Sequence, residues 1–189
     1  MLMIIAATGH RPKDLFGYQS EQPYKALQNL IEEALADIAR QNGLSLAAIE
    51  LRTGGAQGAD QTAFHAGKDI GCTNHVFIPF IGQDSRWQKD GLFGKDAYQR
   101  MLREADYITI VEHIERYSHA TCVAQKLMNR NEAMLDGADI LLAICRCDDW
   151  TTQKGGTAAT MRKAMHSSIP IYRINPMTGE RGWICGTNL

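Results

Sequence analysis

The chain has 189 residues, of which 44% are hydrophobic, enough for one globular domain with a sizeable core. Lysine plus arginine totals 20 and aspartate plus glutamate 21, so the net charge of −1 argues against a protein that coats nucleic acid. Five cysteines, an odd number, do not suggest a disulfide framework and indicate a cytoplasmic protein. The apolar start lacks a basic flank and no apolar run approaches about 20 residues, so we expect neither a signal peptide nor a membrane span.

The predicted elements alternate between strands and helices in chain order. Strands are expected at residues 2–8, 48–52, 74–79, 107–111, 138–145 and 169–174, and helices at residues 23–41, 61–70, 96–105, 118–136 and 157–166. This alternation predicts an α/β fold, a Rossmann-like doubly wound and mainly parallel sheet with helices on both faces. We expect residues 1–176 to form a single domain and residues 177–189 to form a tail, for which the sequence predicts no element.

A glycine-rich stretch, Thr53 to Asp60, lies between the second predicted strand and the second predicted helix. Glycine permits positive φ and a close approach of the backbone to a ligand, and the start of the following helix presents free N–H groups to an anion. Gly155-Gly156-Thr157 forms a similar junction, and Thr8-Gly9-His10-Arg11 ends the first predicted strand. All three turns would lie at the carboxyl edge of the sheet, where ligands of such folds bind. We therefore expect a crevice for a nucleotide-derived molecule.

Several further landmarks follow in order along the chain: Pro79-Phe80, Ser85-Arg86-Trp87, Arg130-Asn131 and Ala138-Asp139. Together with the three turns, this series resembles the YpsA-like branch of the SLOG superfamily, from Thr8 to about Pro176. That superfamily also includes the LOG-type phosphoribohydrolases and DNA-processing protein A. The resemblance implies a Rossmann-like fold, a pocket for nucleotide-derived ligands, and a homodimer or higher homo-oligomer in which the predicted helix at residues 118–136 supplies an interface.

The LOG-type hydrolases cleave the N-glycosidic bond of a nucleotide with an arginine and with the glutamate of a Gly-Gly-x-Gly-Thr-x-x-Glu loop. Arg130 matches that arginine, but in the loop from Gly155 to Arg162 an arginine occupies the glutamate position. Glycoside cleavage requires a carboxylate that stabilises positive charge or activates water. The resemblance therefore favours a binding protein, a sensor or a sequestering protein. The alternative is a LOG-like N-glycosidase that uses another carboxylate, for which Asp60, Asp148 and Asp149 are the candidates.

The candidate ligand-binding residues are Thr8, Gly9, His10, Arg11, Gly54, Gly55, Ala56, Gly58, Asp60, Arg86, Trp87, Arg130, Gly155, Gly156 and Thr157. Arg11 has the fork of donors that suits phosphate, and His10 is a base, a hydrogen-bonding group or only part of the turn. Asp60 either accepts from a ribose hydroxyl or is an acid in the first turn of its helix. Trp87 either stacks on a base, as aromatics do, or holds its loop in place. No catalytic residue is assigned, and the candidates are Arg130 and Asp60.

Other residues near the second glycine turn allow two interpretations. Arg162 contacts a phosphate or is a surface charge, and Trp150 stacks on a ligand or is structural. Cys145-Arg146-Cys147 and the scattered histidines lack the spacing of a zinc site, so we expect no metal and no cofactor. We expect a small molecule as the partner, with no membrane contact. Binding of single-stranded DNA is the weakest hypothesis because the net charge is near zero.

Overall fold

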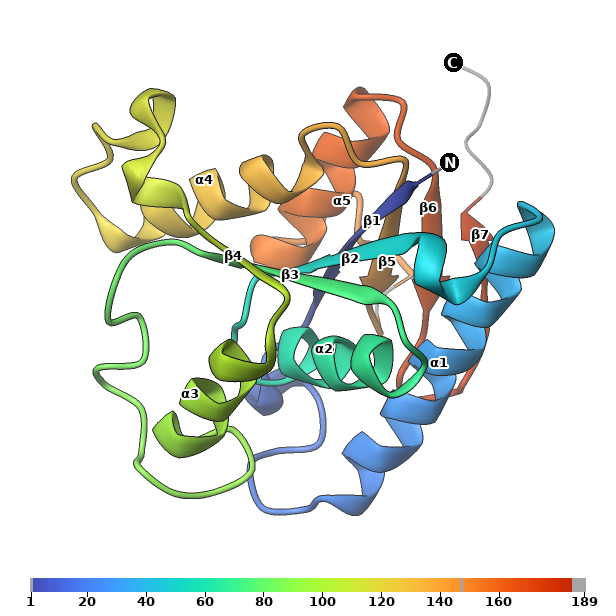
Figure 1. The fold of residues 1–189 in the computed structure, drawn as a ribbon, viewed down its shortest axis with the longest axis horizontal. Coiled ribbons are helices and arrows are strands. Elements are labelled where there is room, and N and C mark those ends of the chain that lie inside the picture. Colours follow the sequence, from blue (N-terminus) through green and yellow to red (C-terminus); the bar gives the residue numbers. More distant parts are fainter. Residues whose placement is uncertain (1, 147, 185–189) are drawn as a thin grey trace.

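The sheet is organised around β1 (Met3–Gly9), the apolar run at the start of the chain. The other strands are β2 (Ile49–Thr53), β3 (Thr73–Ile78), β4 (Tyr107–Ile110), β5 (Ile140–Ile144), β6 (Ile171–Ile174) and β7 (Arg181–Ile184). The strand order is β4-β3-β2-β1-β5-β6-β7 (Figure 1). All neighbouring strands pair in parallel except β6 and β7, which are antiparallel. The computed structural model describes residues 2–146 and 148–184.

Helices cover both faces of this sheet, as Figure 1 shows. They are α1 (Gln22–Gln41), α2 (Ala59–Asp69), α3 (Lys95–Glu104), α4 (Val123–Leu135) and α5 (Gly156–His166). Ile5 and Ala7 of β1 pack in a cluster with α1 and α2, whereas Ala6 between them packs in a second cluster with α4 and α5. This alternation is the period of two of a β-strand, and it explains why β1 is apolar without interruption. The predicted doubly wound sheet is confirmed.

The helix predicted from Ser118 begins only at Val123, and the segment before it is irregular. A short 3-10 turn ends at Tyr117, and the Ser118 hydroxyl donates to the carbonyl of Glu115 at 2.8 Å, which closes that turn. Cys122 is extended, with φ −120° and ψ 153°. Val123, which was expected on the buried stripe, is 58% exposed. The apolar spacing therefore predicted the body of α4 correctly but extended it too far toward the N-terminus.

The segment after residue 176, for which the sequence predicted no element, contributes β7 to the edge of the sheet. The Asn175 side chain accepts the backbone N–H of Met177 at 3.0 Å and turns the chain back. Trp183 then lies opposite Tyr172, with the ring centroids 5.1 Å apart. Cross-strand aromatic pairs of this kind stabilise a sheet edge. Residues 185–189 of the predicted tail lie outside the described residues.

Within the described residues, no helix has both the length and the apolar character needed to cross a membrane.

Candidate functional site

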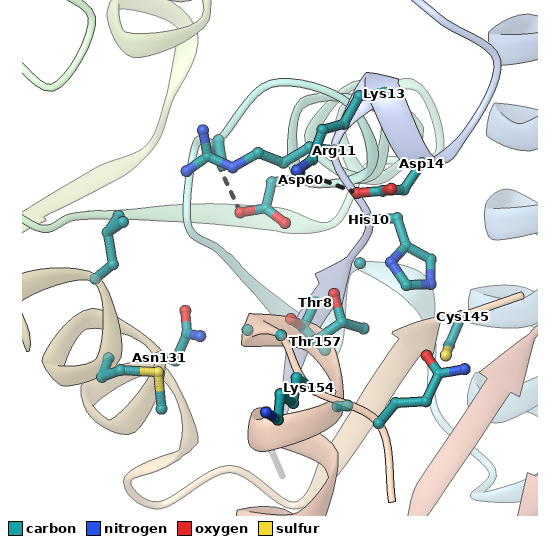
Figure 2. A pocket seen from close by; sticks show the side chains of 18 of the residues that line it. Thr8, His10, Arg11, Lys13, Asp14, Asp60, Asn131, Cys145, Lys154 and Thr157 are labelled. Carbon is teal, nitrogen blue, oxygen red and sulfur yellow. Dashed lines mark hydrogen bonds and ion pairs between the residues drawn. The ribbon is translucent and has the colours of Figure 1, made fainter. Parts of the chain in front are cut away.

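The topological switch point lies between β1 and β5, where the strand order reverses direction. A cavity of about 460 Å³ opens there, which we name the first cavity. Its walls come from the end of β1, the turn that follows, the loop before α2, one side of α4, the end of β5 and the start of α5 (Figure 2). Open α/β sheets bind ligands at this place, so the fold brings the predicted turns of β1 and α5 together.

The start of α5 is the part of the first cavity best suited to an anion. Gly155 has φ +128°, a backbone conformation that favours glycine, and it turns the chain into Gly156 and Thr157. No side chain among the described residues caps this helix start. The first N–H groups of a helix lack partners within the helix, and the helix dipole is positive there. Gly155, Gly156 and Thr157 all line the cavity.

The loop before α2 and the first N–H of that helix are bonded within the chain. The Ala59 N–H donates to the carbonyl of His10 at 3.2 Å, and the Asp60 carboxylate accepts the N–H of Ala56 at 3.3 Å. Ala56 and Asp60 line the first cavity, whereas the glycines of this loop are buried behind it. Gly54, Gly55 and Gly58 therefore shape the turn, and their backbones do not reach the cavity.

Asp60 forms a buried ion pair with Arg130, with 3.1 Å between Oδ2 and Nη1 and only 7% of each side chain exposed. A Cβ atom on Gly54 would overlap the Arg130 guanidinium, so this glycine is required for the pair. Burial raises the pKa of Asp60, while the positive charge of Arg130 and the Ala56 N–H oppose that rise. The Arg130 Nε is buried with no hydrogen-bond partner among the described residues. The pair lines the first cavity and joins the first turn of α2 to α4.

The remaining charges give the first cavity a positive character. Arg11, Arg146 and Lys154 line it, are exposed, and have no ion-pair partner among the described residues. Figure 2 shows Arg11 on the side of Asp60 and Lys154 on the side of Thr157. A cleft lined by charge of one sign raises the local concentration of an oppositely charged ligand. The first cavity is therefore suited to an anion.

His10 also lines the first cavity, and its Nε2 is buried with no hydrogen-bond partner among the described residues. Burial lowers the pKa of His10, and the neighbouring charge of Arg146 lowers it further, whereas Asp14 acts in the opposite direction. The imidazole is therefore neutral near pH 7. Thr8 and Gly9 line the same wall, and Gly9 leaves room for Ala59 and Ile144 to approach β1 closely.

A second cavity of about 400 Å³ adjoins the first. Arg11, Ala56 and Leu127 line both, so the two cavities are contiguous. Arg86 and Trp87, both candidates from the sequence, line only the second. Trp87 is half-buried and packs edge-on against Tyr98, with 5.1 Å between the ring centroids. The candidate residues therefore divide between two cavities that share a boundary.

Three residues near the second glycine turn have structural roles. Arg162, at the position of the glutamate of the LOG-type loop, donates through Nη1 to the carbonyl oxygens of Trp150 at 2.9 Å and Gln153 at 2.8 Å. It therefore holds the loop before α5 and does not line either cavity. Trp150 is 5% exposed and packs in the core with α4 and α5. Asp148 forms an ion pair with Arg173 at 2.6 Å, and neither Asp148 nor Asp149 lines these cavities.

Sequence reasoning missed several lining residues: Lys13, Asp14, Asn131, Arg146 and Lys154. Position offered a signal for some of them, because Lys154 directly precedes the glycine pair and Arg146 follows a buried strand. The described residues contain no group of three or more His, Cys, Asp or Glu side chains that could hold a metal ion. Cys147, part of the Cys-Arg-Cys stretch considered in the sequence, lies outside the described residues.

Comparison with known proteins finds a relative in sequence and solved structures of similar fold. A relative from Bacillus subtilis (strain 168), the SPbeta prophage-derived protein YoqJ, is 29% identical over 136 residues, covering 66% of this chain and 75% of the relative. The DNA processing protein A structure from Streptococcus pneumoniae matches with a TM-score of 0.59 at 15% identity, covering 92% of this chain and 50% of that chain. The one from Helicobacter pylori, described for its single-stranded DNA binding mode, matches with a TM-score of 0.51 at 13% identity, covering 91% and 65%.

The two structural matches show the fold alone, because their sequence identities are low. The family assignment comes from the family model: the YpsA model, described as the YspA SLOG family, matches residues 5–178. That match spans nearly the whole described chain, including both glycine turns and every residue that lines the two cavities. It confirms the resemblance drawn from the order of the landmarks. The chain belongs to the YspA SLOG family.

Proposed function

We propose that the chain binds a nucleotide-derived small molecule at the switch point between β1 and β5, as a sensor or sequestering protein. The observation that carries this proposal is the charge of the first cavity. Arg11, Arg146 and Lys154 line the same cavity as the uncapped start of α5 and have no ion-pair partner among the described residues. A helix start with nearby cations is the usual protein site for a phosphate group. The ligand's phosphate is therefore assigned to the N–H groups of Gly156 and Thr157.

A hydrolase that cleaves N-glycosidic bonds is the second candidate. It requires a carboxylate in the cavity that is free to take part in the reaction. Asp60 is engaged with Arg130 and with the Ala56 N–H. Arg162, in place of the glutamate, binds backbone carbonyls away from the cavity. The other carboxylate on the first cavity is Asp14, whose side chain is 40% exposed. A glycosidase would have to use Asp14 or the ion-paired Asp60, and for this reason we place binding first.

Single-stranded DNA is a third ligand to be tested. The near-zero net charge led us to expect no nucleic-acid partner, but the comparisons give that expectation no support, since one structural relative is described for its single-stranded DNA binding. On this chain, Arg11, Arg86 and Trp87 line the second cavity and would suit a strand of phosphates and bases. Binding to phosphates weakens steeply as salt rises, so a salt titration separates this ligand from a small molecule.

A thermal-shift panel on the full chain tests the proposal. It comprises nucleoside monophosphates, NAD, ADP-ribose, cyclic nucleotides and a short single-stranded DNA. A ligand at 100 times its dissociation constant stabilises the fold by about 2.7 kcal/mol, which in a domain of this size is roughly 5–10 °C. The proposal predicts such a shift, with the ligand recovered intact by mass spectrometry. A ligand recovered as free base and sugar phosphate would establish the hydrolase instead, and a panel without any shift would refute the proposed site.

A matched pair of variants localises the binding. Lys154→Ala removes a cation from the first cavity, and Lys25→Ala removes an exposed lysine of α1 that lines neither cavity. We expect Lys154→Ala to reduce the ligand-induced shift and Lys25→Ala to leave it unchanged. Equal shifts in both variants would show that the ligand binds elsewhere. The predicted homo-oligomer stays a prediction, and light scattering at micromolar concentration tests it.

A further inference from the structure

The second cavity has a wall that is held in place by specific contacts. The loop from Phe80 to Gly94 carries Arg86 and Trp87 and is folded by successive turns, in one of which the Trp87 N–H donates to the carbonyl of Asp84 at 2.9 Å. The Gln83 amide donates to the Tyr98 hydroxyl at 2.8 Å, which ties the loop to α3. The loop therefore presents Trp87 from a fixed position.

The opposite wall of the second cavity comes from α4, and it is joined to the same loop. Lys126 of α4 donates to Glu112 at 2.8 Å, and the other carboxylate oxygen of Glu112 accepts the N–H of Ile81 at 3.0 Å. The Lys126 ammonium also lies 5.3 Å from the centre of the Phe80 ring. This bridge fixes the width between Phe80 and the first turn of α4, where Val123 and Leu127 face the cavity.

The lining of the second cavity differs in chemistry from that of the first. It combines two aromatic rings, Phe80 and Trp87, and two aliphatic side chains, Val123 and Leu127, with two arginines and no carboxylate. Aromatic and aliphatic walls with a few polar groups are typical of sites for planar organic rings, and arginine adds stacking and cation–π contacts. This set suits a nucleobase, whose ring is planar and whose edge accepts hydrogen bonds.

We infer that the second cavity, bounded by Phe80, Trp87, Val123 and Leu127, is the subsite that takes the base of the nucleotide-like ligand. The ligand's phosphate lies at the start of α5 in the first cavity, and its sugar passes between Arg11 and Leu127, which line both cavities. This inference rests on the proposed function, because it requires an anion in the first cavity. According to this inference, Trp87 supplies the part of the binding free energy that comes from the base, and the first cavity supplies the part that comes from the phosphate.

Isothermal titration of the full chain with two kinds of probe tests the subsite. Ribose 5-phosphate carries the sugar and phosphate alone, and the four nucleoside 5′-monophosphates add a base. Stacking of a base on an aromatic side chain is worth about 1–3 kcal/mol, which corresponds to about 5- to 150-fold in affinity. We expect the tightest nucleotide to bind the wild-type chain more strongly than ribose 5-phosphate by a factor in that range.

Two variants assign this ratio to the second cavity. Trp87→Ala removes the stacking ring, and Val123→Tyr fills the cavity from a position that is 58% exposed, so the fold tolerates it. In both variants we expect the affinities for the nucleotide and for ribose 5-phosphate to differ by no more than about twofold. We expect the affinity for ribose 5-phosphate itself to stay unchanged. Lys154→Ala, the control in the first cavity, is expected to weaken both probes by the same factor.

The outcomes separate the two proposals. If both probes bind but neither Trp87→Ala nor Val123→Tyr changes their ratio, the base lies elsewhere, and the subsite is refuted while the anion site stands. If the wild-type chain binds the nucleotides and ribose 5-phosphate with equal affinity, the base subsite is likewise refuted while the anion site stands. If Val123→Tyr alone reduces the ratio, the cavity holds the base and the assignment to the Trp87 ring is overturned. If no probe binds, the anion site fails, and the base subsite fails with it.

Discussion

Replacing Arg130 by methionine is expected to destabilise the fold strongly. The Arg130 guanidinium lies 3.1 Å from the Asp60 carboxylate, and each side chain is 7% exposed. Without Arg130, the only hydrogen bond to Asp60 among the described residues is the one from the Ala56 N–H, at 3.3 Å. Removing one partner of a buried ion pair typically costs about 3–5 kcal/mol, because it leaves an uncompensated charge. For a chain of this size that is a fall in Tm of roughly 6–20 °C.

The same variant is expected to show a defined pH dependence. Burial raises the pKa of Asp60, and the loss of Arg130 removes the charge that opposes this rise. The native state of the variant then binds a proton more tightly than the unfolded chain, whose aspartates have pKa values of about 3.9. Its stability therefore increases as the pH falls through the raised pKa, and the defect is largest above that pKa. Urea denaturation at about pH 7 and about pH 5 measures the difference.

The double variant Asp60→Asn/Arg130→Met is the control for this prediction. It removes both charges and keeps a side-chain oxygen that accepts the Ala56 N–H. Replacement of a whole buried ion pair by neutral residues is often close to neutral in stability, so we expect the double variant to recover most of the loss, with a coupling energy revealed by the mutant cycle. A loss below about 1 kcal/mol in Arg130→Met, or no recovery in the double variant, would contradict this account of the pair.

Two further predictions concern residues beside the first cavity. Arg162→Ala should lower the free energy of unfolding by about 1.5–3 kcal/mol, the typical contribution of hydrogen bonds that involve a charged group. It should also speed amide hydrogen exchange in the loop that carries Trp150 and Gln153. Unchanged exchange would show that Arg162 does not hold that loop. His10 should titrate below its ordinary value of 6.5 in an NMR experiment because burial lowers its pKa. The unfolded chain therefore takes up this proton at a higher pH than the native state does. The contribution of His10 to the free energy of unfolding is present above the ordinary pKa and is lost as the pH falls. An NMR titration midpoint for His10 at or above 6.5 would contradict this.

The sequence predicted strands β1 to β6 because each of them carries a local apolar signal. The strands β1 and β5 are uninterrupted apolar runs, and β2, which precedes the first glycine turn, alternates buried with half-buried residues. The prediction failed where the local pattern competes with turn chemistry, as at Ser118, whose hydroxyl closes a turn before α4. It also missed β7, because that strand depends on pairing with β6 and its side chains are only half-buried or exposed.

The candidate site was predictable as a region but not residue by residue. From the sequence we expected the same role for the glycine turns before α2 and α5, but in the structure only the glycines of the second turn line the cavity. The first turn is folded on itself, because the Asp60 carboxylate accepts the Ala56 N–H, the Ala59 N–H donates to the carbonyl of His10, and Arg130 lies against Gly54. Contacts between residues 70 positions apart, such as this ion pair, leave no trace in local spacing.

The proposed function requires a phosphate at the start of α5. A crystal structure of the chain with the ligand that gives the largest thermal shift tests this position. We expect phosphate oxygens within hydrogen-bonding distance of the Gly156 and Thr157 backbone N–H groups, with Lys154 or Arg146 beside them. A phosphate bound at any other place on the molecule, with this helix start left to water, would contradict it.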